Sequence, residues 1–211
     1  MTSYLTLRRD AEATIEVKRS RFLCTLQRVE DEASARGVVE RLRKQHWDAR
    51  HHCSAFVLGP PPTSVERSSD DGEPAGTAGA PMLEVLRGRG VSDVVAVVTR
   101  WFGGTLLGTG GLARAYADAV RAALDEAGTL RRTLVREHVV VLDHAAAGRV
   151  ENELRTRGVE VLGATYEREV ELRVAVRPED EVRLAATLSE LTGGAARTAV
   201  TGQRWVDSLE P

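Results

Sequence analysis

The most constrained part of the sequence is residues 91–127, where an apolar run is followed by a glycine-rich segment and an alanine-rich helix. The run VSDVVAVV predicts a buried strand, and the helix is expected over Leu112–Ala127. Between them, five of the nine residues from Gly103 to Gly111 are glycine. Glycine lets backbone N–H groups approach a ligand closely, and the start of a helix favours an anion. This segment therefore predicts a site for a phosphate or carboxylate group.

The pattern of apolar residues along the chain predicts a mixed α+β protein of two domains, residues 1–134 and 135–211. In the first domain we expect strands at 13–17, 21–28, 54–58, 65–69 and 94–99, and helices at 32–47, 81–89 and 112–127, with Pro81 as the first helical residue. In the second we expect strands at 137–142, 159–166, 169–177 and 197–206, and helices at 145–157 and 178–191. The order βαββαβ is the split-βαβ pattern of ferredoxin-like folds.

The composition excludes several classes of protein. The net charge is −2, with 19 basic and 17 acidic residues in 1–134 and 10 and 14 in 135–211, so overall charge gives no reason to expect nucleic-acid binding. Two cysteines are too few for a disulfide framework or a cysteine-rich zinc site. No apolar run approaches the ~20 residues of a membrane span, and the N-terminal residues carry no secretory signal. We therefore expect a cytoplasmic protein that does not bind a membrane.

An acidic loop with the sequence Asp70-Asp71-Gly72-Glu73-Pro74 has two interpretations. Three carboxylates within four positions suit a divalent metal or general acid/base chemistry, because hard cations need several oxygen ligands. The alternative is a turn in which aspartate side chains cap nearby backbone N–H groups. The twelve-residue pattern of a calcium-binding loop is absent. Both interpretations stay open, and no metal can be named.

His51, His52 and Cys53 stand just before the strand expected at 54–58, in a segment that we expect to be extended. Because adjacent residues of a strand point to opposite faces, His51 and Cys53 would share one face and His52 the other. A histidine beside a cysteine suits a catalytic or zinc site, but no further cysteine lies nearby in the sequence. We favour a buried, apolar role for Cys53.

Arginine and aromatic residues flank the glycine segment. Arg100 directly follows the central strand, and Arg114 lies near the start of the following helix, so both are candidates to bind an anion. Trp101 and Phe102 either stack a nucleotide base or belong to the core. The segment lacks the Lys-Ser/Thr ending of a P-loop and matches the dinucleotide fingerprint poorly.

Two sequence blocks, SDDGEPAGTAGAPMLEVL (69–86) and VVTRWFGGTLLGTGGLARAY (97–116), occur in this order after ARHHCSAFVLG. With them the chain resembles the IMPACT/YigZ family, over nearly its whole length and in the two-domain bacterial form. The resemblance implies that the first domain has the left-handed βαβ fold of the second domain of a ribosomal small-subunit protein. It implies a ferredoxin-like second domain similar to the last domain of elongation factor G.

The resemblance marks a set of residues and links the family to translation, but it carries over no activity from the bacterial form that this chain resembles. Eukaryotic members of the family regulate translation by interfering with the activation of a kinase that acts on an initiation factor. The family motif marks as characteristic, not as catalytic, the following residues: Asp70, Asp71, Gly72, Glu73, Pro74, Arg100, Gly103, Gly104, Gly110, Gly111 and Arg114.

The first functional hypothesis is a non-enzymatic cytoplasmic factor that associates with RNA or the ribosome and regulates translation. Its candidate anion- or RNA-binding residues are Arg100, Trp101, Gly103, Gly104, Gly110, Gly111 and Arg114. The alternative is an enzyme or sensor that binds a small phosphorylated ligand or a nucleotide. There the acidic loop would hold a divalent metal, and His51 or His52 would serve as acid or base. In a third interpretation both blocks are structural and the function lies on an unmarked protein-binding surface.

Overall fold

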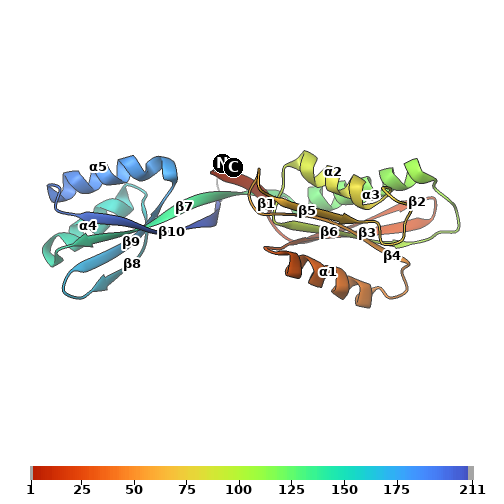
Figure 1. The fold of residues 1–211 in the computed structure, drawn as a ribbon, viewed down its shortest axis with the longest axis horizontal. Coiled ribbons are helices and arrows are strands. Elements are labelled where there is room, and N and C mark those ends of the chain that lie inside the picture. The colour runs from red at the N-terminus through yellow and green to blue at the C-terminus, as the bar shows by residue number, and fades with distance from the viewer. Residues whose placement is uncertain (1, 209–211) are drawn as a thin grey trace. The chain divides into compact units, whose positions relative to one another are not determined.

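The computed structural model describes residues 2–208, which form two compact units (Figure 1). Residues 3–131 make up the first unit and residues 132–208 the second, and each has its own hydrophobic core. Both units combine helices with a sheet, which confirms the predicted α+β class. Among the described residues, no helix has the length and apolar character needed to cross a bilayer.

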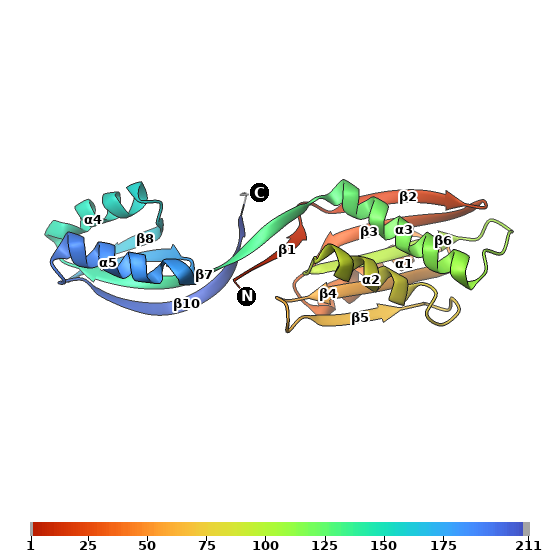
Figure 2. The same ribbon diagram turned by 90° about the horizontal axis from the view of Figure 1, so that it is seen from above.

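The first unit is built on a five-stranded sheet in the order β2-β3-β6-β4-β5 (Figure 2). Its strands are β2 (Ala11–Val17), β3 (Ser20–Arg28), β4 (His51–Leu58), β5 (Val65–Ser69) and β6 (Val94–Trp101). All neighbouring strands pair antiparallel. Because β3 and β4 both run antiparallel to β6, they are parallel to each other and need a crossover connection. Helix α1 (Glu32–Gln45) provides it.

Strand β6 is buried on both faces of the sheet. Every residue from Val94 to Arg100 is buried. The even positions from 94 to 98 pack in one core cluster, whereas Val95 and Val97 pack with α1 on the opposite face. Successive side chains of a strand alternate between faces, so a strand covered on both sides has a continuous apolar sequence. This burial on both faces explains the continuous apolar run in the sequence of β6.

Helices α2 (Gly79–Arg89) and α3 (Thr109–Ala127) cover the face of the sheet opposite α1 (Figure 1). Both begin earlier than the sequence predicts. Pro81 is the third residue of α2 rather than the first, which is tolerated because the N–H groups of the first turn have no intrahelical acceptor. Gly110 and Gly111 lie in the first turn of α3 rather than in the preceding loop.

The second unit has the predicted βαββαβ order. Its elements are β7 (Thr129–Leu142), α4 (His144–Thr156), β8 (Glu160–Tyr166), β9 (Val170–Val176), a short 3-10 turn (Pro178–Asp180), α5 (Glu181–Thr192) and β10 (Arg197–Ser208). The strand order β10-β7-β9-β8 places the last strand beside the first, as in ferredoxin-like folds. Strand β7 begins at Thr129, within the first unit, and strand β1 (Ser3–Leu7) of that unit, which the sequence does not predict, pairs with it.

Gly103, just after β6, lies against the turn between β2 and β3. A Cβ atom at this position would stand 2.1 Å from the backbone carbonyl carbon and oxygen of Arg19. We expect Gly103→Ala to lower the free energy of unfolding by about 1–3 kcal/mol, the usual cost of overpacking. Gly110→Ala is the control, because a Cβ there meets no atom within 4 Å. Urea unfolding followed by circular dichroism compares the two, and equal stability would contradict the close approach.

Candidate functional site

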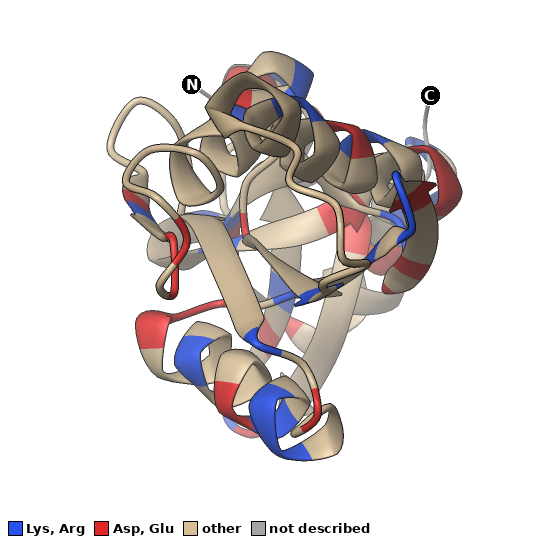
Figure 3. Cartoon of the chain, turned by 90° about the vertical axis from the view of Figure 1, so that its right-hand side faces the viewer, with Lys and Arg blue, Asp and Glu red and all other residues tan. Residues whose placement is uncertain are grey.

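Four connections of the first unit meet at one end of its sheet, which we call the loop end. They are the β2–β3 turn (residues 18–19), the α1–β4 connection (46–50), the β5–α2 loop (70–78) and the β6–α3 loop (102–108). Strand pairing places Arg21 opposite Trp101 and His51 opposite Arg100. The sequence blocks that carry the family resemblance are therefore neighbours in space. Figure 3 looks onto this end, where both basic and acidic positions gather.

A buried ion pair lies at the centre of the loop end. Arg100 Nη1 donates a hydrogen bond to Glu73 Oε1 at 2.5 Å, and the two side chains are only 7% and 4% exposed. The hydroxyl of Tyr116, on α3, donates to the same oxygen at 2.8 Å. His51 Nε2 lies 3.9 Å from that oxygen. The carboxylate of Glu73 thus joins the β5–α2 loop to both β6 and α3.

Burial fixes the protonation of two neighbouring groups. It raises the pKa of Tyr116 far above its usual value, so the phenol stays protonated and donates to Glu73. It also raises the pKa of Cys53 to about 12. Cys53 Sγ lies 3.0 Å from the carbonyl oxygen of Asp70 and 3.3 Å from the Tyr116 hydroxyl. A protonated, buried thiol is a poor nucleophile, which agrees with an apolar core role for Cys53.

Asp70 orders the loop that precedes α2. Its Oδ1 accepts hydrogen bonds from the N–H groups of Ala78 and Gly79 at 3.0 and 2.8 Å, and its Oδ2 accepts from Gly76 N–H at 2.8 Å. Burial alone would raise the pKa of Asp70, but these three donors outweigh it and lower the pKa below its usual value. The side chain therefore caps the start of α2, as the turn interpretation of the acidic loop requires.

The other acidic side chains of this loop point in different directions. Asp71 Oδ1 accepts from Arg43 Nη2 at 2.8 Å, and its Oδ2 accepts from the backbone N–H of His52 at 2.7 Å. Glu73 faces the buried arginine instead. Within residues 2–208, no group of three or more histidine, cysteine, aspartate or glutamate side chains is placed to hold a metal ion. The three carboxylates thus serve three separate structural contacts.

Strand β4 places its two histidines on opposite faces of the sheet, as alternation requires. His51 lies beside Glu73, and its Nδ1 is 2.9 Å from the carbonyl oxygen of Asp71. His52 is 3% exposed, and burial lowers its pKa, which favours the neutral imidazole. Of the two acid/base candidates, His51 is therefore the one that faces Glu73.

The three candidate ligand-binding side chains differ in exposure. Arg100 is buried and already paired. Trp101 is half-buried: its Nε1 donates to Asp48 Oδ2 at 2.9 Å, and Arg21 Cζ lies 3.7 Å from the ring centre. Arg114 is exposed on α3 and forms no ion pair with a described residue. Of these three, Arg114 is the side chain free to meet a ligand from solvent.

The candidate glycines have distinct roles around the β6–α3 loop. Gly104 and Gly108 adopt φ values of 82° and 75°, a left-handed backbone that other residues rarely take. Gly103 permits the close approach to the β2–β3 turn. Gly110 and Gly111 leave the first turn of α3 without side chains. The glycines therefore shape the loop and the first turn of the helix that follows it.

Sequence reasoning missed several exposed side chains of the loop end. Trp47 and Leu106, each 83% exposed, were not singled out, whereas Phe102, already a candidate, is 45% exposed. Five exposed cations form no ion pair with a described residue: the candidate Arg114 and four that the sequence did not single out, Lys18, Arg19, Arg21 and Arg50. The available signals were the run KRSR at 18–21 and a tryptophan between the polar residues His46 and Asp48 at the end of a predicted helix.

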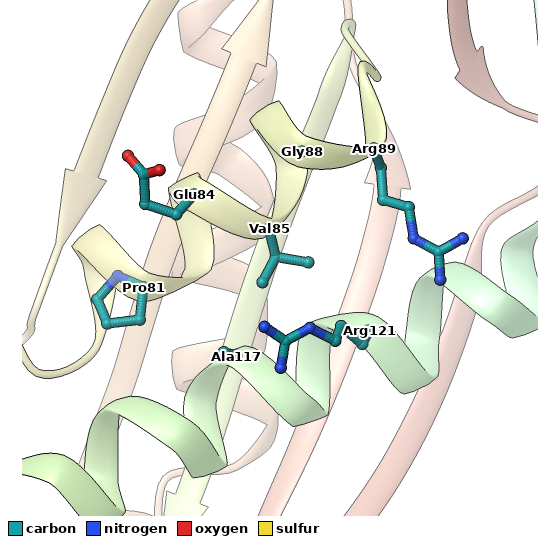
Figure 4. Close-up of a pocket in the computed structure, with 7 residues that line it drawn as sticks. All are labelled: Pro81, Glu84, Val85, Gly88, Arg89, Ala117 and Arg121. Carbon is teal, nitrogen blue, oxygen red and sulfur yellow. The ribbon is translucent and has the colours of Figure 1, made fainter.

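A separate hollow of about 380 Å³ lies between α2 and α3 (Figure 4). It is lined by Pro81, Glu84, Val85, Gly88, Arg89, Ala117 and Arg121. Both of its arginines form ion pairs with aspartates of α3: Arg89 with Asp125, and Arg121 with Asp118. Arg121 lies about two helical turns from Arg114 on the same face of α3. The two positions thus offer a matched comparison between a paired and an unpaired cation.

Comparisons with known proteins match both units. The Impact N-terminal domain family matches residues 18–124, and a domain of unknown function (DUF1949) matches residues 140–195. A crystal structure described as that of a hypothetical protein is 37% identical, with a TM-score of 0.67, and the alignment covers 96% of this chain and 98% of that one. The fold and the matched regions define a two-domain protein with an Impact N-terminal domain.

Two curated relatives extend this match over most of the chain. IMPACT family member YvyE of Bacillus subtilis (strain 168) is 41% identical, over 91% of this chain and 88% of the relative. IMPACT family member YigZ of Escherichia coli (strain K12) is 41% identical, over 85% of this chain and 88% of the relative. The chain belongs to the IMPACT family.

Removing one partner of the buried ion pair is expected to destabilise the first unit strongly. Glu73→Gln would leave the Arg100 guanidinium buried without a countercharge, a change that costs about 3–5 kcal/mol in other proteins. The double variant Glu73→Gln/Arg100→Met should cost less than the sum of the two single changes, because no charge is then stranded. Chemical unfolding of the three variants gives the coupling. If Glu73→Gln were as stable as the wild type, the stabilising role of the Glu73–Arg100 ion pair would be contradicted.

The lowered pKa of Asp70 predicts a loss of stability in acid. A carboxylate whose pKa falls on folding stabilises the protein fully above its unfolded pKa of 3.8. This contribution is lost as the pH falls through the lower, folded pKa. We therefore expect the difference in unfolding free energy between wild type and Asp70→Asn to shrink below about pH 4. Unfolding measured from pH 6 to pH 2 tests this, and a difference that grows in acid would refute it.

Proposed function

We propose that the protein is a non-enzymatic factor of translation that associates with RNA, including the RNA of the ribosome, through its loop end. The observation that carries the proposal is the set of five exposed, unpaired cations gathered there: Lys18, Arg19, Arg21, Arg50 and Arg114. Phosphate contacts from such residues supply most of the affinity of a protein for nucleic acid.

Local charge supports this proposal where the net charge of −2 does not. Two of the four acidic residues in these loops are paired with arginines: Glu73 with Arg100, and Asp71 with Arg43. Asp48 and Asp70 accept hydrogen bonds from uncharged N–H groups and keep their negative charge. The five exposed cations therefore outnumber the unpaired acidic residues of these loops. A long-range electrostatic attraction for RNA depends on this local excess and not on the total charge of the chain.

The non-enzymatic part of the proposal is supported by how the reactive side chains are used. Cys53 is protonated and buried, and Asp70 caps a helix. The histidines lie on opposite faces of β4. The link to translation comes from the family resemblance, and the expected cytoplasmic location comes from the sequence. The link is an analogy at the level of family, and the binding experiment is its test.

The test is co-sedimentation with purified ribosomes at 50 and 200 mM salt, beside fluorescence anisotropy with a labelled 12-nucleotide RNA. About four phosphate contacts predict a roughly 50-fold weaker affinity for the single strand at the higher salt. The variant Arg19→Ala/Arg114→Ala should bind more weakly and with a smaller salt slope. Arg121→Ala, on the same helix face, is the control and should bind as the wild type does.

Two results would overturn the proposal. One is the absence of binding to both ribosomes and RNA at 50 mM salt. The other is an equal loss of binding in the Arg121→Ala control, which would place the contacts away from the loop end. Binding to ribosomes alone, with no affinity for RNA, would assign the interaction to ribosomal proteins instead.

A further inference from the structure

The loop end carries a flat aromatic surface that is backed by a fixed cation. The Arg100 guanidinium carbon lies 5.4 Å from the ring centre of Phe22 and 5.8 Å from that of Phe102. The ion pair with Glu73 holds this guanidinium in place, and Phe22 is fully buried against Tyr116. Phe102 is the outermost member of this stack and remains 45% exposed.

A second stack ends in an exposed guanidinium. Arg21 Cζ lies 3.7 Å from the centre of the Trp101 ring, directly across the β3–β6 pair. The Trp101 ring is itself held by the hydrogen bond to Asp48 and by an edge contact with His46 at 5.4 Å. Arg21 is exposed and forms no ion pair with a described residue. Its planar head therefore lies on a fixed ring at the protein surface.

We infer that the loop end binds unpaired bases of single-stranded RNA, with Phe102 and Arg21 as the two stacking surfaces. Aromatic rings and arginine planes are the groups on which proteins stack splayed bases. Both surfaces are held by buried or hydrogen-bonded neighbours, so little conformational entropy is lost when a base stacks on them. This inference rests on the proposed function and specifies its ligand.

The two stacking surfaces lie on opposite sides of the sheet, because Arg100, beside Phe102, and Trp101, beneath Arg21, are adjacent residues of β6. A bound strand would therefore pass around the loop end from one surface to the other.

The surrounding cations suit the backbone of such a strand. Arg19 is held beside the β6–α3 loop by a 3.2 Å hydrogen bond from its Nη2 to Thr105 Oγ1. Lys18 is its neighbour in the β2–β3 turn, and Arg114 lies past the far end of the loop. Stacking requires bases that are free of a partner strand, whereas phosphate contacts alone do not distinguish single strands from duplexes. A higher affinity of the protein for single-stranded RNA than for duplex RNA would therefore indicate stacking.

The experiment uses the full chain and fluorescence anisotropy with a 12-nucleotide oligouridine and a 12-base-pair RNA duplex. Arg21→Lys keeps the charge but removes the plane, and Phe102→Leu keeps an apolar side chain but removes the ring. We expect each to weaken binding of the single strand about tenfold, within the range measured for one stacked base. The salt slope should stay unchanged, because no phosphate contact is removed. Leu106→Ala, in the same β6–α3 loop as Phe102, is the control and should bind the single strand as the wild type does.

The outcomes separate this inference from the proposed function. Wild-type affinity for oligouridine in both conservative variants, with binding still lost in Arg19→Ala/Arg114→Ala, would refute stacking and leave the RNA-association proposal standing. Equal affinity for the duplex and the single strand would also refute stacking. No binding to either RNA would overturn both. Thermal unfolding of each variant checks that a loss of affinity does not reflect a loss of fold.

Discussion

The buried ion pair between Glu73 and Arg100 is the interaction on which the loop end depends. Two charges removed from water need a close partner, and further hydrogen bonds lower the cost of their burial. Arg100 pairs with Glu73, although its buried Nε has no hydrogen-bond partner among the described residues. The Tyr116 hydroxyl supplies one such bond to Glu73, and burial keeps that phenol protonated. Because the three residues come from a loop, a strand and a helix, the pair fixes those segments against one another. Asp70, three residues before Glu73, anchors the same loop to the start of α2.

This use of charge explains why a chain of net charge −2 has a basic surface at one end. The acidic residues of the β5–α2 loop turn inward or pair locally, whereas the basic residues of the β2–β3 turn remain in solvent. The ion pair also backs Phe102 through Arg100. The family motif is therefore largely a framework, and the RNA-binding surface that we propose consists mainly of residues beside the motif, such as Arg19 and Arg21.

Local sequence was sufficient for most of the secondary structure. Alternation and apolar runs predicted β3, β4 and β6, and β4 also placed His51 and His52 on opposite faces. The order βαββαβ predicted the second unit. Strand β1 was missed because its five residues are ordered by pairing with a strand more than a hundred residues later. The start of α3 was placed late, since glycine has low helix propensity and tertiary packing overrode it.

The sequence by itself determined the fold class, the central position of β6 and the two blocks that mark the family, because these depend on periodicity and local composition. Only the tertiary structure decided what each charged residue does. Arg100 and Arg114 are equivalent candidates in the sequence, yet one is buried against a carboxylate and the other is exposed. Ion pairing and burial depend on which distant segments meet. Strand pairing and helix packing bring those segments together, and no local pattern records the result.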